Sequence, residues 1–331
     1  MTMKNIGASV RARINNKAKA DKVNTQFLLI RYSLERLLYR LAVSEHRDSF
    51  LLKGALLFDL WYDVPLRPTR DIDLLGFGMA EIPHLIKVFE DLCAIEVEDG
   101  ISFDAATIKA EEIRKDANYS GTRVTLVGTI DGAKCTVQVD VGYGDAVTPA
   151  PEMATYPVML EDMPAPELRV YPQYTVIAEK FEAIVALGMA NSRVKDYFDL
   201  WVLLRNADLD QAILEQAIQA TFKRRETAMP KGIPTGLSDQ FANDGTRKDL
   251  WSAFVSRNKL EAESLEHTVK YLRERFSFTF NEKGEIAMDM DYFFSEPTLP
   301  PELREFRERL KEHKFSENVA WILNTDRKSV V

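Results

Sequence analysis

The sequence has 331 residues, a formal net charge of −8, 46% hydrophobic residues and 28% charged residues. This balance excludes a disordered chain, and the length suits two packed lobes better than a single core. Because the protein is acidic, it does not attract polyanions over its whole surface, so contact with nucleic acid requires local basic patches.

Two basic patches are present, and each can also be a solvated tail or helix end. The start of the chain has no apolar run after its basic residues, and nothing later is apolar enough to span a bilayer, so we expect a cytoplasmic protein without a secretory signal or membrane segment. The patches are Lys4, Arg11, Arg13, Lys17 and Lys19, and then Lys223, Arg224 and Arg225.

The first 95 residues predict alternating helices and strands. Apolar residues at helical spacing predict a helix over 22–46 and another over 81–95. Between them, 49–54 reads as a strand, 55–64 as a helix that stops before Pro65, and 70–78 as a second strand.

Three β segments follow at 101–113, 122–130 and 134–142, the last two joined by Asp131 and Gly132 in a tight hairpin. From 147 to 172 the chain holds six prolines, which predict an irregular crossing between lobes. Thr175 is expected to cap the helix that comes next.

The rest of the chain predicts a mostly helical lobe. Helices are expected at 175–188, 192–205, 209–224, 247–257 and 263–276, with an exposed loop over 231–248, a hairpin turn at 281–285 and an amphipathic segment after Pro300. The expected fold class is α+β (α/β): a mixed sheet with flanking helices over 1–150, a Pro-rich crossing over 151–172 and a mostly helical domain over 173–331.

Asp71 and Asp73 are two apart in a predicted strand, so their carboxylates project from the same face. A lone pair of this kind is by default an acidic turn or edge. Asp140 supplies a third acid, on the face of its strand opposite Val137 and Val139. Three carboxylates on neighbouring strands can hold one or two Mg²⁺ ions that bridge a nucleoside triphosphate and activate an attacking hydroxyl, with Asp140 as ligand or base.

Gly54 lies where a strand meets a helix, a place where a backbone without Cβ can approach a phosphate. A plain strand-to-helix turn is the alternative reading. Thr69 and Arg70 precede the acids and would lie near bound phosphates, unless they form an ordinary turn.

The sequence lacks the residues that several other kinds of site would require. Cys93 and Cys135 are the only cysteines and have no ligand-spaced partner, so we expect two small buried thiols without a disulfide or zinc site. The four histidines are scattered, which argues against a nucleophile triad, and no glycine-rich P-loop or dinucleotide-binding motif is present.

At this point the motifs resemble the AbiEii-type toxins, a branch of the nucleotidyltransferase superfamily. FLLKGALLFDLWYDVPLRPTRDIDLL is similar to that family's first motif, and YPQYTVIAEKFEAIVALG and RVKDYFDLW are similar to its later ones. The resemblance implies a nucleotidyltransferase domain followed by a helical domain, and transfer of a nucleoside monophosphate from an NTP with Mg²⁺ or Mn²⁺.

The resemblance also assigns residues. It places Gly54 at the phosphate corner, Asp71 and Asp73 at the metal, and Lys180 at the triphosphate, with Asp196 and Asp199 completing the set. On its helix Lys180 lies one turn from apolar residues, so it needs an anion, either a phosphate or an acid of the next helix. Ala55 departs from the superfamily's Gly-Ser corner, and Thr69 is the substitute hydroxyl.

The function expected from this resemblance is a toxin that modifies RNA, with the tRNA 3′ end as the acceptor, and so stops translation and growth in abortive infection and phage defence. A cognate AbiEi-like antitoxin is the expected partner. A protein or small-molecule acceptor, or a binding module without catalysis, remains open. The sequence leaves undecided which NTP is used, the antitoxin mechanism and the oligomeric state.

Overall fold

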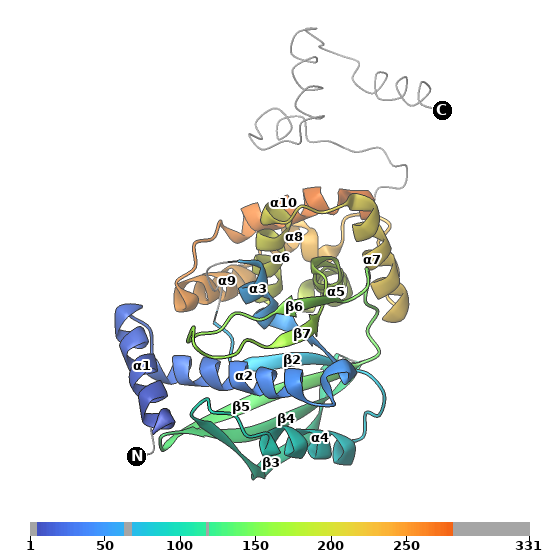
Figure 1. The fold of residues 1–331 in the computed structure, drawn as a ribbon. Helices are drawn as coiled ribbons and strands as arrows, with labels where there is room; N and C mark the ends of the chain where they lie inside the picture. The colour runs from blue at the N-terminus through green and yellow to red at the C-terminus, as the bar shows by residue number, and fades with distance from the viewer. Residues whose placement is uncertain (1–4, 63–67, 117–118, 281–331) are drawn as a thin grey trace, which may run out of the picture.

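The computed structural model describes residues 5–62, 68–116 and 119–280. Its centre is a seven-stranded mixed sheet with the strand order β3-β4-β5-β2-β1-β7-β6 (Figure 1). The β2–β5 and β1–β7 pairs are parallel, and the other neighbours are antiparallel. The strands are β1 (Phe50–Lys53), β2 (Asp71–Gly76), β3 (Ile101–Asp116), β4 (Tyr119–Ile130), β5 (Ala133–Tyr143), β6 (Glu152–Thr155) and β7 (Glu167–Val170).

Helices cover the sheet unequally. Helices α1, α2 and α4 come from the first hundred residues and lie in the lower part of the view in Figure 1. Helices α5 to α10 gather in its upper part, beyond β6 and β7. The predicted mixed α/β fold is therefore confirmed. The helices are α1 (Ile6–Ala20), α2 (Thr25–Val43), α3 (Phe58–Trp61), α4 (Ile82–Ala94), α5 (Gln173–Leu187), α6 (Val194–Asn206), α7 (Gln211–Arg224), α8 (Asp239–Ala242), α9 (Gly245–Asn258) and α10 (Leu265–Arg275).

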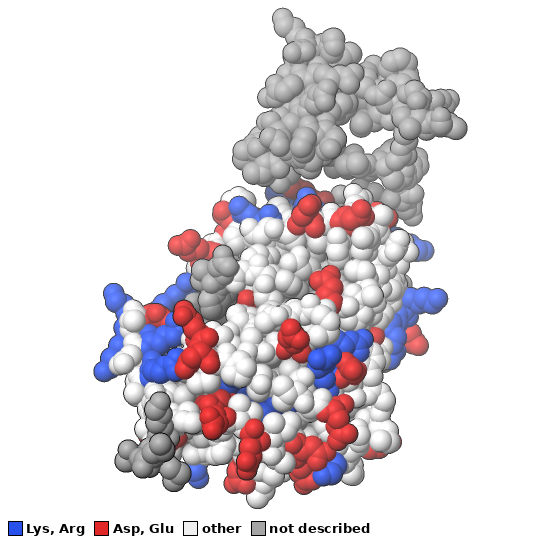
Figure 2. All heavy atoms as spheres, in the orientation of Figure 1, with Lys and Arg blue, Asp and Glu red and all other residues white. Residues whose placement is uncertain are grey.

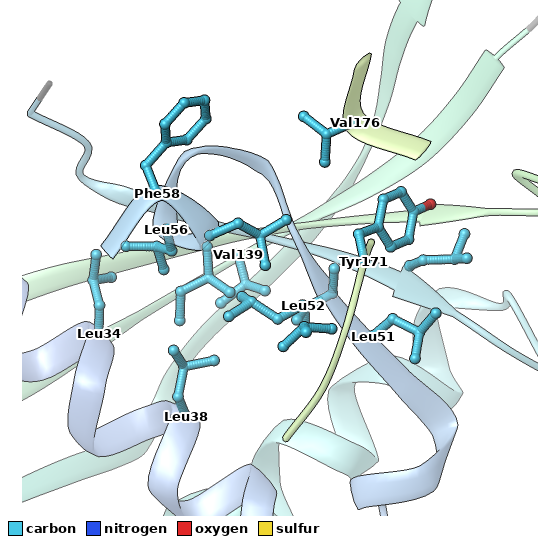
Figure 3. Packing of buried hydrophobic residues seen from close by; sticks show 14 of the residues in the cluster. Leu34, Leu38, Leu51, Leu52, Leu56, Phe58, Val139, Tyr171 and Val176 are labelled. Atoms are coloured by element: carbon cyan, nitrogen blue, oxygen red, sulfur yellow. The ribbon is translucent and has the colours of Figure 1, made fainter. Parts of the chain in front are cut away.

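The core between α2 and the sheet fixes which strand face is left for the site. Leu34 and Leu38 of α2 pack toward Leu52 and Val139 of the sheet (Figure 3). Because side chains alternate along a strand, burying Val137, Val139 and Val141 here turns Gln138 and Asp140 to the opposite face. The predicted division of β5 into two faces is confirmed.

Helix α1 was not predicted, because its basic residues were read as a tail or helix end. It buries Val10, Ile14 and Ala18 and exposes its basic side chains, which gather at one end of the molecule (Figure 2). Arg11 lies beside Asp131, and Arg13 pairs with Asp162. A stripe of only three apolar positions among cations is a weak periodic signal, and packing on α2 and β4 makes this segment a helix.

The expectation of irregular structure over 147–172 is wrong. Strand β7 pairs in parallel with β1, at Leu52 opposite Val170, and β6 pairs with β7. The six prolines flank these four-residue strands instead of interrupting them, so the ladder loses no N–H donor. The segment that was expected to join two lobes is thus partly an extension of the sheet.

Two further expectations need correction. Thr175 does not cap α5, which begins after Pro172; its buried hydroxyl donates to the carbonyl of Thr148, 2.9 Å away. The predicted loop over 231–248 contains the short helix α8 and buries Leu237 and Phe241. The predicted turn at 281–285 and the segment after Pro300 lie outside the described residues.

Several charged side chains of α2 are buried. Arg40 donates to Asp99, with a distance of 2.7 Å from Nη1 to Oδ2. Glu35 accepts from the backbone N–H of Met159 at 2.6 Å. Burial raises the pKa of the Glu35 carboxyl group to about 7, although Arg36 opposes the shift. This network ties α2 to the loops before β3 and before β7.

In the described ranges, no helix has the length and apolar character needed to cross a membrane. The two cysteines are free thiols; Cys135 is buried, as predicted, whereas Cys93 is half-buried.

Candidate active site

A cleft of about 1090 Å³ lies between the sheet and helices α5, α6 and α7. One wall is formed by the ends of β1, β2, β4 and β5, and the other by α5 and the ends of α6 and α7. The charged residues among its lining are Lys53, Asp71, Asp73, Arg123, Asp140, Asp145, Glu179, Lys180, Glu182, Arg193, Lys195, Asp196, Arg224, Arg225 and Glu226.

The three predicted acids come together on the cleft side of the sheet. Asp73 of β2 is in register with Asp140 of β5, and parallel neighbouring strands lie roughly 4.8 Å apart. Asp71 is on the same face two residues earlier, and Ile72 between them is buried. The buried hydroxyl of Thr69 donates to Asp71, so Thr69 orients an acid of the row. Arg70 is exposed and does not line the cleft.

Gly54 makes room for Asp73. It follows β1 with φ +76°, and a Cβ placed on it would lie 2.2 Å from Asp73 Oδ2 and 2.8 Å from Asp73 Cγ. Only glycine adopts this backbone conformation without strain while leaving that space. The close neighbour of Gly54 is therefore a carboxylate of the acid row; its predicted contact with phosphate stays a prediction.

Asp140 is held by an arginine that the sequence analysis did not single out. Arg123 lies opposite it on β4 and donates from Nε to Oδ1 at 2.9 Å and from Nη2 to Oδ2 at 3.0 Å. The pKa of the Arg123 guanidinium is raised, chiefly by these hydrogen bonds and also by the charges of Asp140 and Asp71. Arg123 could have been found by counting back along β4 from the two-residue turn.

Lys180 meets the two acids of α6. Its Nζ lies 2.7 Å from Asp196 Oδ1 and 2.8 Å from Asp199 Oδ2. Of the two anions predicted for Lys180, the acid of the next helix is therefore present. Arg193 also pairs with Asp196 at 2.7 Å. Burial by itself raises the pKa of the Asp196 carboxyl group, but Lys180 and Arg193 outweigh it, so the pKa is lowered. A triphosphate contact of Lys180 stays a prediction.

A second ionic network at the back of the cleft was missed. Lys53 of β1 donates to Asp145 at 2.6 Å and lies 3.4 Å from Glu179 of α5. Arg225, after α7, contacts both acids and pairs with Glu182 at 2.8 Å. Burial raises the pKa of the Glu179 carboxyl group, an effect partly offset by Lys53. The one local signal was a lysine inside the apolar run FLLK.

Cations also stand at the cleft mouth. Lys195 and Arg224 line the cleft and are exposed, and Lys223 is exposed next to Arg224. Arg224 donates to the carbonyl of Gly144, which fixes it near the end of β5. Of the predicted basic cluster, Arg225 therefore turns inward, and its two neighbours face solvent.

The acid row has the chemistry of a site for a hard divalent cation. Its donors are carboxylate oxygens on rigid neighbouring strands, and the missing Cβ of Gly54 lets one of them pack closely. Among the described residues, the group of three such side chains whose ligand atoms all lie within 4.8 Å of one another is Glu45, His46 and Asp91, not the acid row. They lie at the ends of α2 and α4, away from the cleft lining, and Lys87 already pairs with Asp91 at 2.6 Å.

Comparison with known proteins gives one family and two structures. The sequence model described as nucleotidyl transferase AbiEii toxin, type IV TA system, matches residues 36–275. The crystal structure of JHP933 from Helicobacter pylori is similar with 14% identity, 92% of this chain and 99% of that chain covered, and a TM-score of 0.43. That of a candidate nucleotidyltransferase from H. pylori has 15% identity, coverages of 89% and 100%, and a TM-score of 0.42. None of the curated proteins matches this chain.

Proposed function

The chain belongs to the AbiEii nucleotidyl transferase toxin family of type IV toxin–antitoxin systems, and we propose that it transfers a nucleoside monophosphate from an NTP to the 3′ end of a tRNA. The observation that carries the proposal is the acid row of Asp71, Asp73 and Asp140. It faces, across one cleft, the cations of α5, α6 and the end of α7. Acids that bind a metal ion opposite cations that bind phosphates are what nucleotidyl transfer requires.

Asp71 and Asp73 are proposed to hold Mg²⁺ or Mn²⁺, which when bound would neutralise charge on the triphosphate. Thr69 keeps Asp71 oriented through its hydrogen bond, and Gly54 gives the Asp73 carboxylate its space. Asp140 is proposed as the third acid, either a further ligand or the group beside which the acceptor hydroxyl is activated.

The helical side is proposed to bind the triphosphate. Lys180 presents an ammonium whose position is fixed by Asp196 and Asp199, both about 1% exposed. A lysine oriented in advance loses little side-chain entropy when it meets a phosphate. Asp196 and Asp199 thus act through Lys180. Of the two acids, Asp196 lines the cleft and Asp199 does not.

A polyanionic acceptor suits the cleft mouth better than a neutral one. Lys195 and Arg224 line the cleft, with Lys223 beside them, and all three side chains are exposed. Such cations can follow a phosphate backbone although the protein as a whole carries −8. By modifying tRNA the enzyme would stop translation and growth in the cytoplasm, until a cognate AbiEi-like antitoxin neutralises it.

The test is incubation of the purified protein with each α-³²P-labelled NTP, Mg²⁺ and total tRNA, beside an Asp71→Asn, Asp73→Asn variant. We expect label on tRNA with the wild-type protein and none with the variant. A Lys134→Gln variant, changed at an exposed lysine on the β4–β5 turn side of the sheet, is the control and should label tRNA normally.

Each other outcome removes a defined part of the proposal. Label on protein or on a small molecule instead of tRNA would replace the acceptor and keep the transferase. Absence of transfer with every NTP and acceptor would leave a nucleotide-binding module. Equal labelling by the Asp71→Asn, Asp73→Asn variant would refute the acid row as the site.

A further inference from the structure

Arg123 is a basic side chain that hydrogen-bonds an acid of the row. It occupies both oxygens of Asp140, at 2.9 and 3.0 Å, in the two-pronged geometry that makes arginine–carboxylate pairs strong. The Asp140 side chain is only 5% exposed, whereas that of Arg123 is 34% exposed. The pair thus consists of a buried carboxylate and a partly exposed guanidinium that lines the cleft.

A second contact keeps Arg123 in this place. With its side-chain amide turned to satisfy both groups, Gln138 accepts from Arg123 Nε at 3.3 Å and from Nη2 at 3.2 Å. Gln138 is in register with Asp71, as Asp140 is with Asp73. The guanidinium therefore covers the β5 half of the site, and the β2 half is formed by Asp71 and Asp73.

The hydrogen bonds from Arg123 already satisfy both carboxylate oxygens of Asp140. A divalent ion bound by Asp71 and Asp73 leaves that pair intact. A second divalent ion would have to displace the guanidinium from a carboxylate that has little access to water, and a buried charge is costly to separate from its partner. The charge of Asp71, like that of Asp140, raises the pKa of the Arg123 guanidinium.

We propose that Arg123 is a positioning residue that holds Asp140 out of the metal site, so that the protein's own divalent ion is bound by Asp71 and Asp73 alone. The guanidinium then supplies the positive charge at the Asp140 end of the row. Its exposed edge presents N–H donors to a substrate phosphate in the cleft. This inference rests on the proposed nucleotidyl transfer site and decides, within it, what Asp140 does.

The experiment measures Mn²⁺ binding to the full-length protein without nucleotide, by the electron paramagnetic resonance signal of free Mn²⁺. Because Glu45, His46 and Asp91 form a separate cluster of ligand atoms, every protein carries His46→Ala. Asp140→Asn alone is uninformative, since it leaves Arg123 as an unpaired cation near the ion. The decisive protein is the double variant Arg123→Gln, Asp140→Asn, which replaces a neutral ion pair by a neutral amide pair.

We expect the double variant to bind Mn²⁺ with a Kd within about threefold of the parent protein. Asp71→Asn should raise the Kd more than about tenfold, since losing even a supporting partner of a metal site typically costs that much. Arg123→Gln alone should bind Mn²⁺ more tightly than the parent, because it frees the Asp140 carboxylate. Thermal melting of each variant shows that it is folded.

Three results would overturn the inference. If the double variant loses Mn²⁺ affinity as strongly as Asp71→Asn, Asp140 is itself a ligand, and the proposed metal site survives without the role of Arg123. If Arg123→Gln leaves the Kd for Mn²⁺ unchanged, the guanidinium does not hold Asp140 out of the metal site. If Asp71→Asn also leaves the Kd unchanged, the proposed metal site fails and the inference fails with it.

Discussion

Replacing Gly54 by alanine tests how closely the backbone and the acid row fit. The added Cβ would lie 2.2 Å from Asp73 Oδ2 and 2.7 Å from Asp73 Cβ, so the Asp73 side chain must move. The positive φ of +76° adds backbone strain of about 1–2 kcal/mol. Because a displacement of about 1 Å at a reacting centre can cost roughly 10²-fold in rate, we expect transferase activity to fall by about that factor.

The matched control is Gly132→Ala in the β4–β5 turn. Gly132 has nearly the same φ, +79°, but nothing lies within 4 Å of its added Cβ. Both variants should lose similar stability from backbone strain, measured as the free energy of unfolding in urea, and only Gly54→Ala should lose activity in the labelled-NTP assay. If Gly54→Ala keeps activity within about threefold of Gly132→Ala, the close packing of Gly54 on Asp73 has no catalytic meaning.

Three further predictions concern the buried charges and the metal. The pKa of Glu35 is about 7 against its ordinary 4.5, so the folded state binds the extra proton between these pH values. The free energy of unfolding in urea should therefore fall by about 3 kcal/mol relative to Glu35→Gln as the pH rises from 4.5 to 7. The same pH dependence of the free energy of unfolding in both proteins would contradict this. Lys180→Met removes the cation that Asp196 and Asp199 share, although Arg193 still pairs with Asp196, and should cost about 3 kcal/mol in the free energy of unfolding. The exposed Lys195→Met should cost less than about 0.5 kcal/mol. Removal of divalent ions by EDTA should abolish transfer, and added Mg²⁺ or Mn²⁺ should restore it; transfer that persists in EDTA would refute the metal requirement.

Local patterns in the sequence predicted most of the elements that carry the site. The strand FLLK, the DID strand and the hairpin turn at Asp131 and Gly132 depend on short-range alternation and turn geometry, so they could be read directly. With a two-residue turn the register of β4 against β5 follows as well, and it places Arg123 opposite Asp140. That contact was available from the sequence and was overlooked.

Other features could not be read locally. Strands β6 and β7 are four residues each and are flanked by prolines, and only the exposed edge of β1 makes β7 a strand. The pairing of Lys53 with Asp145 and Glu179 joins side chains from three segments that are distant in sequence. The local sequence around each of these residues does not predict the other two. Helix α1 depends in the same way on its packing against α2 and β4.

The sequence by itself determined that Asp71 and Asp73 share a face, because the period of two belongs to any strand. It also determined that Lys180 needs an anion, because an ammonium on a largely apolar helix face cannot stay unpaired. Only the tertiary structure decided which groups meet these needs: Arg123 takes both oxygens of Asp140, and Asp196 and Asp199 take Lys180. Those choices depend on how strands and helices pack across the cleft, and the free energy of that packing is set by burial over the whole chain.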